Sequence, residues 1–225
     1  MFKFNEKQST FNLISNDGII EMRGKFIHEL VKEDFQRVGS INLTDYKLID
    51  LKYLSDNFPN VIRLSIKGAN HVENLNGIQY LQSLKDLVIE STSLTDWKLL
   101  NQLKQLDYLN IENCLKAKIV LDYIPKSVTG LILNANYTDL NGLSDLNTLT
   151  NLNISGIDAD IEFLPEFPGN VKKLNLRGFP KFSDGSCFKN LDSKTYLNNQ
   201  LENAIDNLPD HLTDNKWFKH PSNRL

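Results

Sequence analysis

The sequence has few of the residues that most directly indicate chemistry. Its 225 residues include two cysteines and four histidines. Cys114 and Cys187 lie far apart without the spacing of metal ligands, and the histidines do not cluster, so we predict no metal site. A glycine-rich phosphate-binding loop is also missing, and we expect no cofactor. Two cysteines without a pattern are typical of reduced, buried thiols.

An excess of basic charge is also missing. Lys and Arg number 25 against 28 Asp and Glu, which gives a formal net charge of -3. A nucleic-acid-binding protein usually carries excess cations to neutralise phosphates, so we expect no nucleic acid partner. The chain has no apolar run long enough to cross a membrane, and its start, MFKFNEKQST, lacks the apolar core of a secretion signal. We therefore expect a cytoplasmic protein with no membrane partner.

No set of catalytic residues is recognisable. The one local cluster is Asp184-Gly185-Ser186-Cys187, which could be a cysteine nucleophile beside an acid or a turn followed by a buried cysteine. We favour the turn. Asp158 and Asp160 could suggest a cation site, although carboxylates on a connecting loop are more often solvated. We predict that the protein is not an enzyme.

The sequence does contain an internal repeat. The segments LKDLVIEST from Leu84 and LDYLNIENC from Leu106 share one frame, and the same frame starts at positions 38, 61, 84, 106, 128, 149 and 171. Successive starts differ by 23, 23, 22, 22, 21 and 22 residues, and every copy has an apolar residue at its first, fourth and sixth positions. Seven copies in register indicate one repeated structural unit.

The spacing within each copy predicts a strand, followed by a return stretch. The fourth and sixth side chains point to one face of a strand, because successive residues alternate between faces. Stacked neighbours must bury this row, since a single coil cannot. We expect the following residues of the return stretches to close the core from the other side: Leu54, Ile78, Leu81, Leu100, Leu103, Leu121, Ile124, Leu143, Leu146 and Leu164.

This pattern resembles the leucine-rich-repeat superfamily in its short, 22-residue class. Leu94-Thr95-Asp96, followed by Leu99-Leu100 and Leu103, is similar to the internalin-type repeat of bacteria. The resemblance covers about residues 38–180. It implies an α/β solenoid, with a curved parallel β-sheet on the concave face, short helical or irregular return segments on the convex face, and a cap at each end. It says little about function, since one fold can serve many functions.

The ninth position departs from the family pattern. The family often has Asn there, where its amide bonds to the backbone of adjacent coils. Here the column contains Tyr46, Ala69, Thr92, Cys114, Asn136, Ile157 and Phe179. Asn136 fits the pattern best, Thr92 and Cys114 are plausible substitutes, and the ladder is otherwise mostly missing. We therefore expect apolar packing in place of this ladder, and irregular coils. Pro125, Pro165 and Pro168 also favour irregular return stretches, because each removes a backbone donor.

We divide the chain into a cap over 1–37, seven repeats over 38–180, and a C-terminal cap or tail over 181–225. In the first part, Phe11–Ile14 and Ile19–Met22 flank the hairpin signal Asn16-Asp17-Gly18, and a helix is predicted over 26–35. In the last, we predict a helix over 191–208, ended by Pro209. The tail with Trp217 and Phe218 either packs back as a cap or becomes ordered on a partner.

The outward positions of each copy, the third, fifth and seventh, predict the binding surface. Asp86, Glu90 and Glu112 would form an acidic centre around Tyr108. Val88 and Ile132 would add apolar area within a polar surround, which often marks an interface. Arg63 with Lys67, and Lys173 with Arg177, would make basic flanks. The residues we predict to bind a partner are Arg63, Lys67, Asp86, Val88, Glu90, Tyr108, Asn110, Glu112, Ile132 and Asn134.

Several functions fit a non-enzymatic protein-binding module. We favour a bacterial immunity protein that binds and neutralises a protein toxin, such as a basic toxin domain. The small size, the mild acidic excess and the lack of a secretion signal and of catalytic residues favour this function, and the acidic centre would suit a basic partner. The first alternative is a secreted internalin-like effector or adhesion protein. The second is a regulatory or scaffold subunit. We expect the chain to be a monomer before it binds its partner.

Overall fold

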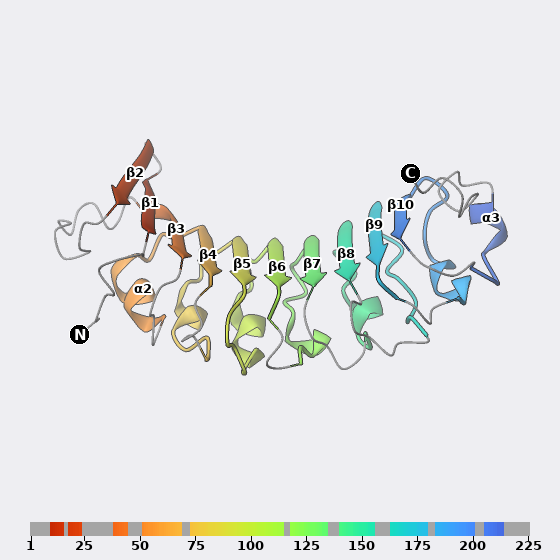
Figure 1. Ribbon diagram of the computed structural model, residues 1–225, viewed down its shortest axis with the longest axis horizontal. Helices are drawn as coiled ribbons and strands as arrows, with labels where there is room; N and C mark the ends of the chain where they lie inside the picture. Colours follow the sequence, from red (N-terminus) through yellow and green to blue (C-terminus); the bar gives the residue numbers. More distant parts are fainter. Residues whose placement is uncertain are drawn as a thin grey trace.

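A ten-stranded sheet runs the length of the molecule. The computed structural model describes residues 10–15, 18–23, 38–44, 51–68, 73–114, 118–134, 140–155, 163–179, 183–200 and 205–213. Their strands stand side by side in the order β10-β9-β8-β7-β6-β5-β4-β3-β1-β2. Figure 1 shows that the row bends into a shallow arc, with the strands on the inner side and short helical turns on the outer side.

Each of the seven predicted repeats contributes one parallel strand. These strands are β3 (Val38–Thr44), β4 (Arg63–Lys67), β5 (Asp86–Glu90), β6 (Tyr108–Glu112), β7 (Gly130–Asn134), β8 (Asn151–Ser155) and β9 (Lys173–Arg177). From β4 to β9, every strand begins at the third position of its copy. Neighbouring strands pair without offset, as in Leu64 with Leu87 and Leu87 with Leu109. Equal positions of the repeat therefore form straight columns across the sheet.

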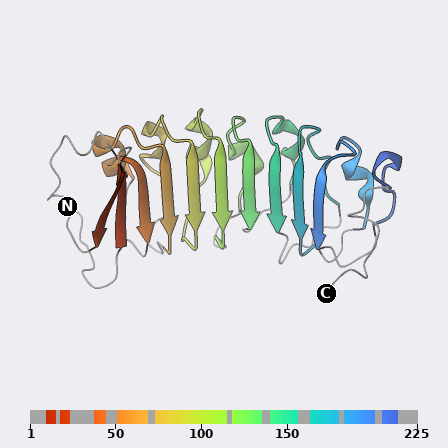
Figure 2. The same ribbon diagram turned by 90° about the horizontal axis from the view of Figure 1, so that it is seen from above.

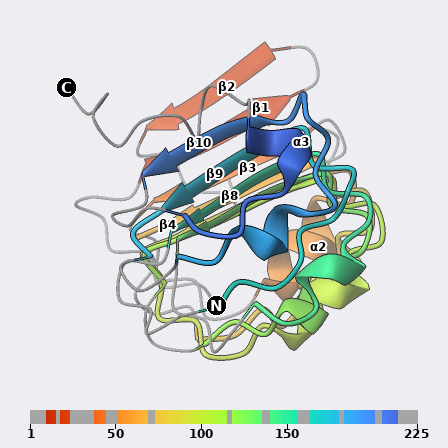
Figure 3. The same cartoon turned by 90° about the vertical axis from the view of Figure 1, so that its right-hand side faces the viewer.

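The core lies between the sheet and the return stretches. The first, fourth and sixth columns of all seven repeats are buried, and they join one hydrophobic cluster that extends to Leu212. All ten return-stretch residues that we predicted to close the core are buried as well. Figure 3, an end-on view, shows the sheet on one side of this core and the helical turns on the other. The predicted leucine-rich-repeat solenoid is confirmed.

The return stretches are short and vary in form. Their described residues contain one α-helical turn, α2 (Lys52–Asn57), and four 3-10 turns: η2 (Ile78–Tyr80), η3 (Lys98–Gln102), η4 (Leu121–Tyr123) and η5 (Leu143–Asp145). Between β8 and β9, residues 163–170 form no helix, and Pro165 and Pro168 lie there. The prediction of irregular returns near the prolines is confirmed for this stretch.

An antiparallel hairpin continues the sheet at its N-terminal edge. β1 (Thr10–Ser15) pairs with β2 (Gly18–Arg23), as the sequence predicted, and β1 also pairs antiparallel with β3. Figure 2 shows these strands beside the parallel array. The predicted helix over 26–35 and the tail with Trp217 and Phe218 lie outside the described residues.

The helix predicted over 191–208 is wrong. Residues Tyr196–Gln200 form β10, which pairs in parallel with β9 at the register of an eighth repeat. The first, fourth and sixth positions of this coil hold Lys194, Leu197 and Asn199, so only one apolar position remains and the repeat is hard to recognise. The unpaired backbone of β9 favours a strand there, because it offers donors and acceptors along its whole edge. The sheet thus continues past residue 180.

Among the described residues, side-chain hydrogen bonds between coils form at the ninth position and also elsewhere. At the ninth position, Thr92 Oγ1 and Cys114 Sγ of adjacent coils lie 3.3 Å apart in a hydrogen bond, whereas Phe179 is fully buried. The residue before each of two later copies also bonds to the preceding coil: Ser127 Oγ donates to the Leu106 carbonyl at 2.6 Å, and Thr148 Oγ1 donates to the Lys126 carbonyl at 2.6 Å. Side chains at the start of a coil therefore take over part of the ladder's role.

Candidate functional site

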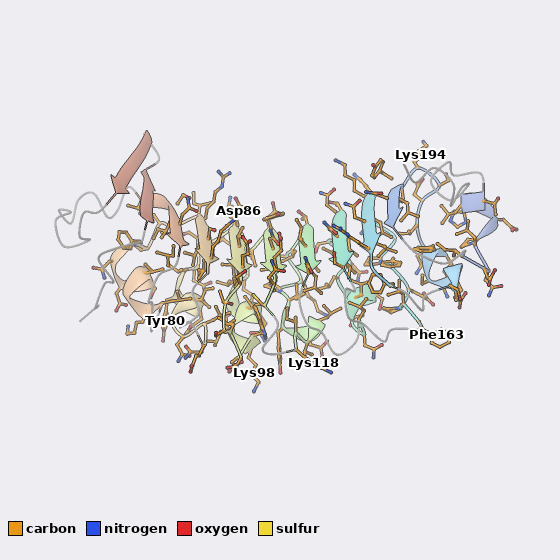
Figure 4. All side chains as sticks on the ribbon, viewed as in Figure 1. Tyr80, Asp86, Lys98, Lys118, Phe163 and Lys194 are labelled. Carbon is orange, nitrogen blue, oxygen red and sulfur yellow. The ribbon has the colours of Figure 1, made fainter. Side chains whose placement is uncertain are left out.

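The ten residues that we predicted to bind a partner all lie on β4, β5, β6 and β7, at the outward positions of these strands. They form one continuous surface, because the strands pair in register. In Figure 4, Asp86 points to the strand side of the molecule, whereas Tyr80, Lys98 and Phe163 point to the opposite side. The sequence placed these residues together, and the structure decides how they interact.

The predicted acidic centre is largely neutralised within the protein. Arg63 Nε lies 2.6 Å from Asp86 Oδ2, and Lys67 Nζ lies 2.9 Å from Glu90 Oε2. Each pair joins equal positions on β4 and β5, where the register brings opposite charges face to face. The separate basic flank and acidic centre therefore become two cross-strand ion pairs. Such partly exposed pairs add little to stability, but they leave less charge for a partner.

Glu112 is the carboxylate of this cluster that keeps its charge available. Its Oε1 accepts a hydrogen bond of 2.6 Å from Asn110 Nδ2, two residues earlier on β6. Among the described residues, no cation forms an ion pair with it. The seventh-position neighbours of Glu112 are Glu90 on β5 and Asn134 on β7. Neither neighbour supplies a positive charge: one is a second carboxylate and the other is a neutral amide.

Tyr108 occupies the centre of the face, beside a glycine. It pairs with Gly130 on β7, and a Cβ placed on Gly130 would lie only 3.0 Å from Tyr108 Cδ2. The phenol ring therefore covers the strand where Gly130 has no side chain. Burial raises the pKa of Tyr108 above its usual value near 10.0, and the negative charges of Glu112 and Asp86 raise it further. The hydroxyl stays protonated at neutral pH, where it can donate a hydrogen bond.

Two hollows open on either side of the Tyr108 ring. The first has a volume of about 420 Å³ and the second about 330 Å³. The residues beside Tyr108 in the first are Ser40, Asn42, Arg63, Leu64, Ser65, Asp86 and Val88. In the second they are Gly130, Leu131, Ile132, Asn151, Leu152, Asn153, Lys173 and Asn175. A partner could thus place a side chain on each side of one aromatic ring.

A half-buried row crosses the middle of the face at the fifth position. Val88, Asn110 and Ile132 lie next to one another on β5, β6 and β7. The Asn110 Oδ1 atom is buried and has no hydrogen-bond partner within the described structure. An unsatisfied buried acceptor costs about 1–3 kcal/mol, so it favours a ligand that can donate to it.

Two outward residues of the concave face are not among those predicted from the sequence. Tyr196 and Asn198 continue the third and fifth columns onto β10, and Tyr196 is 42% exposed. Their coil was missed because it retains only Leu197 of the three apolar positions. Its distance from the preceding copy, 23 residues from Val171 to Lys194, matches the other intervals and could have revealed it.

The cluster around Cys187 has the geometry of a turn. Asp184 caps the 3-10 turn η6 (Gly185–Phe188): its Oδ1 accepts from the Ser186 amide at 3.0 Å and its Oδ2 from the Ser186 hydroxyl at 2.9 Å. Cys187 is buried, and burial raises the pKa of its thiol well above the usual range, with Asp184 adding to the increase. A protonated, buried thiol is a poor nucleophile, which supports the interpretation as a turn.

The described residues contain no group of three or more His, Cys, Asp or Glu side chains arranged to hold a metal ion. Asp158 and Asp160, which suggested a cation site, lie outside that part of the chain. No helix within the described ranges is long and apolar enough to cross a membrane.

Among the comparisons with known proteins, one solved structure supports the fold. No protein-family model and no curated protein sequence matches the chain. Internalin C2 of Listeria monocytogenes has a similar structure, with a TM-score of 0.52 and 19% identity over 76% of this chain and 84% of that chain. An internalin F of the same species covers 76% of this chain and 77% of its own, at 16% identity and a TM-score of 0.35. The likeness to internalin C2 and the columns of the sheet agree that this chain folds as a leucine-rich-repeat solenoid.

Proposed function

We propose that the chain is a protein-binding module that holds its partner on the concave face around Tyr108. One observation carries the proposal: a half-buried tyrosine separates two hollows at the centre of that face. Tyrosine is enriched at the centres of interfaces, because it combines a large apolar area with a hydrogen-bonding hydroxyl. Concave solenoid faces offer such extended surfaces to partners.

The neighbours of Tyr108 support the same surface. Val88 and Ile132 add apolar area within a polar surround, and Asn110 Oδ1 lacks a donor in the described structure. A partner that covers this row would bury apolar surface and satisfy that acceptor in one step. Glu112 would contribute a charge at the rim of the contact.

The experiment is a comparison of variants in an affinity capture. Tagged wild-type protein, Tyr108→Ala and Tyr80→Ala are used to capture proteins from the native cells, and the captured proteins are identified by mass spectrometry. Tyr80 is the matched control, because it is 61% exposed and lies on the side opposite the strands. We expect a partner that wild type and Tyr80→Ala retain and Tyr108→Ala loses, with a weakening of about 30-fold or more in a direct titration.

Circular dichroism must first show that both variants are folded. A partner that Tyr108→Ala retains at full affinity would move the contact away from this face. Loss of the partner from Tyr80→Ala alone would assign the contact to the convex side.

The nature of the partner remains a prediction. The hypothesis of toxin neutralisation in the cytoplasm rests partly on the acidic centre, and the two ion pairs neutralise Asp86 and Glu90 and leave Glu112. Capture of a small toxin domain would support this hypothesis. Detection of the chain outside its cells would support the internalin-like alternative, and a stable complex with a cellular enzyme would support a regulatory subunit.

A further inference from the structure

Two cations on the C-terminal part of the concave face lack an ion-pair partner among the described residues. Lys173 and Arg177 occupy the third and seventh positions of β9, and both are exposed. Neither forms an ion pair with any described residue, in contrast to Arg63 and Lys67 at the same positions of β4. The neighbouring third and seventh positions on β8 hold Asn151 and Ser155, which carry no charge to neutralise them.

A row of amides lies between these two cations. Asn153, Asn175 and Asn198 occupy the fifth positions of β8, β9 and β10, and they pair in register. Within the described part of the chain, none of these three side chains makes a hydrogen bond. Each amide can donate and accept at once, as a peptide group does. Such a row is suited to the backbone of an extended segment.

The hollow beside Tyr108 adjoins this row. Asn153, Asn175 and Lys173 line it together with Ile132. Its volume of about 330 Å³ is sufficient for an acidic side chain whose methylene groups contact Ile132 and whose carboxylate approaches Lys173. The site therefore combines an apolar contact, amide donors and a positive charge.

We infer that β8, β9 and β10 bind an extended acidic segment of the partner protein, with its carboxylates against Lys173 and Arg177 and its backbone against the amide row. This inference rests on the proposed function and names the charge of the partner segment. Charge complementarity carries it: the two cations are exposed and form no ion pair with a described residue, whereas the cations on β4 are already neutralised. The partner segment that it predicts is acidic, whereas the partner expected from the sequence is basic.

Nucleic acid would also present negative charge to these cations. The concave face offers only these two unpaired cations among its described outward residues, and the whole chain has a net charge of -3. Nucleic-acid affinity comes mainly from many phosphate contacts, so a protein segment is the better fit.

The test uses three probes with the full chain, at low salt. The first is a short fluorescein-labelled peptide in which glutamate alternates with alanine, the second replaces every glutamate with lysine, and the third is a single-stranded oligothymidylate of equal charge to the first. Fluorescence anisotropy measures the affinities. The variant Lys173→Glu/Arg177→Glu is compared with Lys98→Glu, which makes the same kind of change on the convex side. Nitrogen-proton NMR spectra of the asparagine side chains then locate the bound peptide.

We expect millimolar or tighter binding of the glutamate peptide, no binding of the lysine peptide, and shifted amide signals for Asn153 and Asn175. The double variant should weaken binding of the glutamate peptide by at least about tenfold, since both attractive charges are reversed, while Lys98→Glu should not. No glutamate binding, equal binding of both peptides, or tighter binding of the oligonucleotide would overturn the inference. If a captured partner needs Tyr108 but tolerates the double variant, this inference fails and the proposed function stands; a partner that needs neither contradicts both.

Discussion

The two halves of the concave face have the same backbone geometry, but their cations have different neighbours. On β4 and β5, Arg63 and Lys67 meet Asp86 and Glu90 at equal positions of adjacent strands. On β8 and β9, Lys173 and Arg177 meet Asn151 and Ser155. The repeat fixes where each side chain stands, and the identity of the next coil decides whether its charge is neutralised. Column positions alone therefore do not predict the charge that a partner meets.

The largest expected difference between the halves concerns two glycines that begin equivalent turns. Gly77 precedes η2 with φ of 96°, and a Cβ there would lie 2.1 Å from the Lys52 backbone nitrogen. Gly142 precedes η5 with φ of 85°, and its nearest contact would be the Asp122 side chain at 3.0 Å. We expect Gly77→Ala to lower the free energy of unfolding by about 3–5 kcal/mol, because backbone cannot move aside, and Gly142→Ala by about 1–2 kcal/mol.

Urea unfolding monitored by the fluorescence of tryptophan, including the buried Trp97, measures both values. Equal costs for the two variants would mean that the coil around Gly77 can shift as readily as a side chain.

At the boundary of the halves, Asn110→Leu should raise the free energy of unfolding by about 0.5–1 kcal/mol. The substitution removes a buried acceptor that lacks a partner and extends the apolar contacts between Val88 and Ile132. These gains should exceed the loss of the hydrogen bond to the half-exposed Glu112. Thermal unfolding of Asn110→Leu and of wild type tests the sign. A less stable variant would show that the bond to Glu112 outweighs the orphaned acceptor.

The ion pairs of the first half should give a smaller effect. A double-mutant cycle on Arg63 and Asp86 should yield a coupling of about 0.5 kcal/mol, since the Arg63 side chain is 71% exposed, and molar salt should reduce it. Arg177→Ala in the other half should change the free energy of unfolding by less than this, because it breaks no described pair. Chemical denaturation at low and high salt provides both numbers. A cost for Arg177→Ala above the Arg63–Asp86 coupling would indicate that its charge is already used within the protein.

The smallest expected effect is on the titration of Tyr108, between the halves. Glu112→Gln should lower the Tyr108 pKa, but not to its usual value, because burial is the larger cause of the increase. Carbon NMR of labelled tyrosine rings measures it, and Glu90→Gln serves as the control. The raised pKa also predicts how the free energy of unfolding depends on pH. The contribution of Tyr108 is fully present below its unfolded pKa near 10, and it is lost as the pH rises through its pKa in the folded protein. A Tyr108 pKa that is identical in wild type and Glu112→Gln would remove that carboxylate as a cause.

Apolar periodicity makes most of the fold predictable from the sequence. Columns such as Leu64, Leu87 and Leu109 recur at nearly constant intervals, so the strands, the parallel register and the buried return residues could all be predicted. β10 could not be predicted in this way, because Lys194 and Asn199 stand at two of the three apolar positions of its coil. There the unpaired edge of β9 determines the structure, which is a property of the neighbouring coil and not of the segment itself.

In the candidate site, the positions of the side chains could be predicted, but the contacts between coils could not. Counting positions placed Asp86, Tyr108 and Glu112 on one face, because strand alternation is a local rule. The positions did not reveal that Arg63 forms an ion pair with Asp86, or that the Tyr108 ring covers Gly130. Both contacts join residues of different coils, 22 or 23 positions apart in the sequence.

By itself, the sequence determined that the chain is a solenoid and which side chains point inward, because each short repeat must bury its apolar row against the next. The tertiary structure alone decided which outward charges cancel, where the hollows beside Tyr108 open, and how far the sheet extends. These properties depend on the distance between adjacent coils, and the chain acquires that distance only when the coils stack.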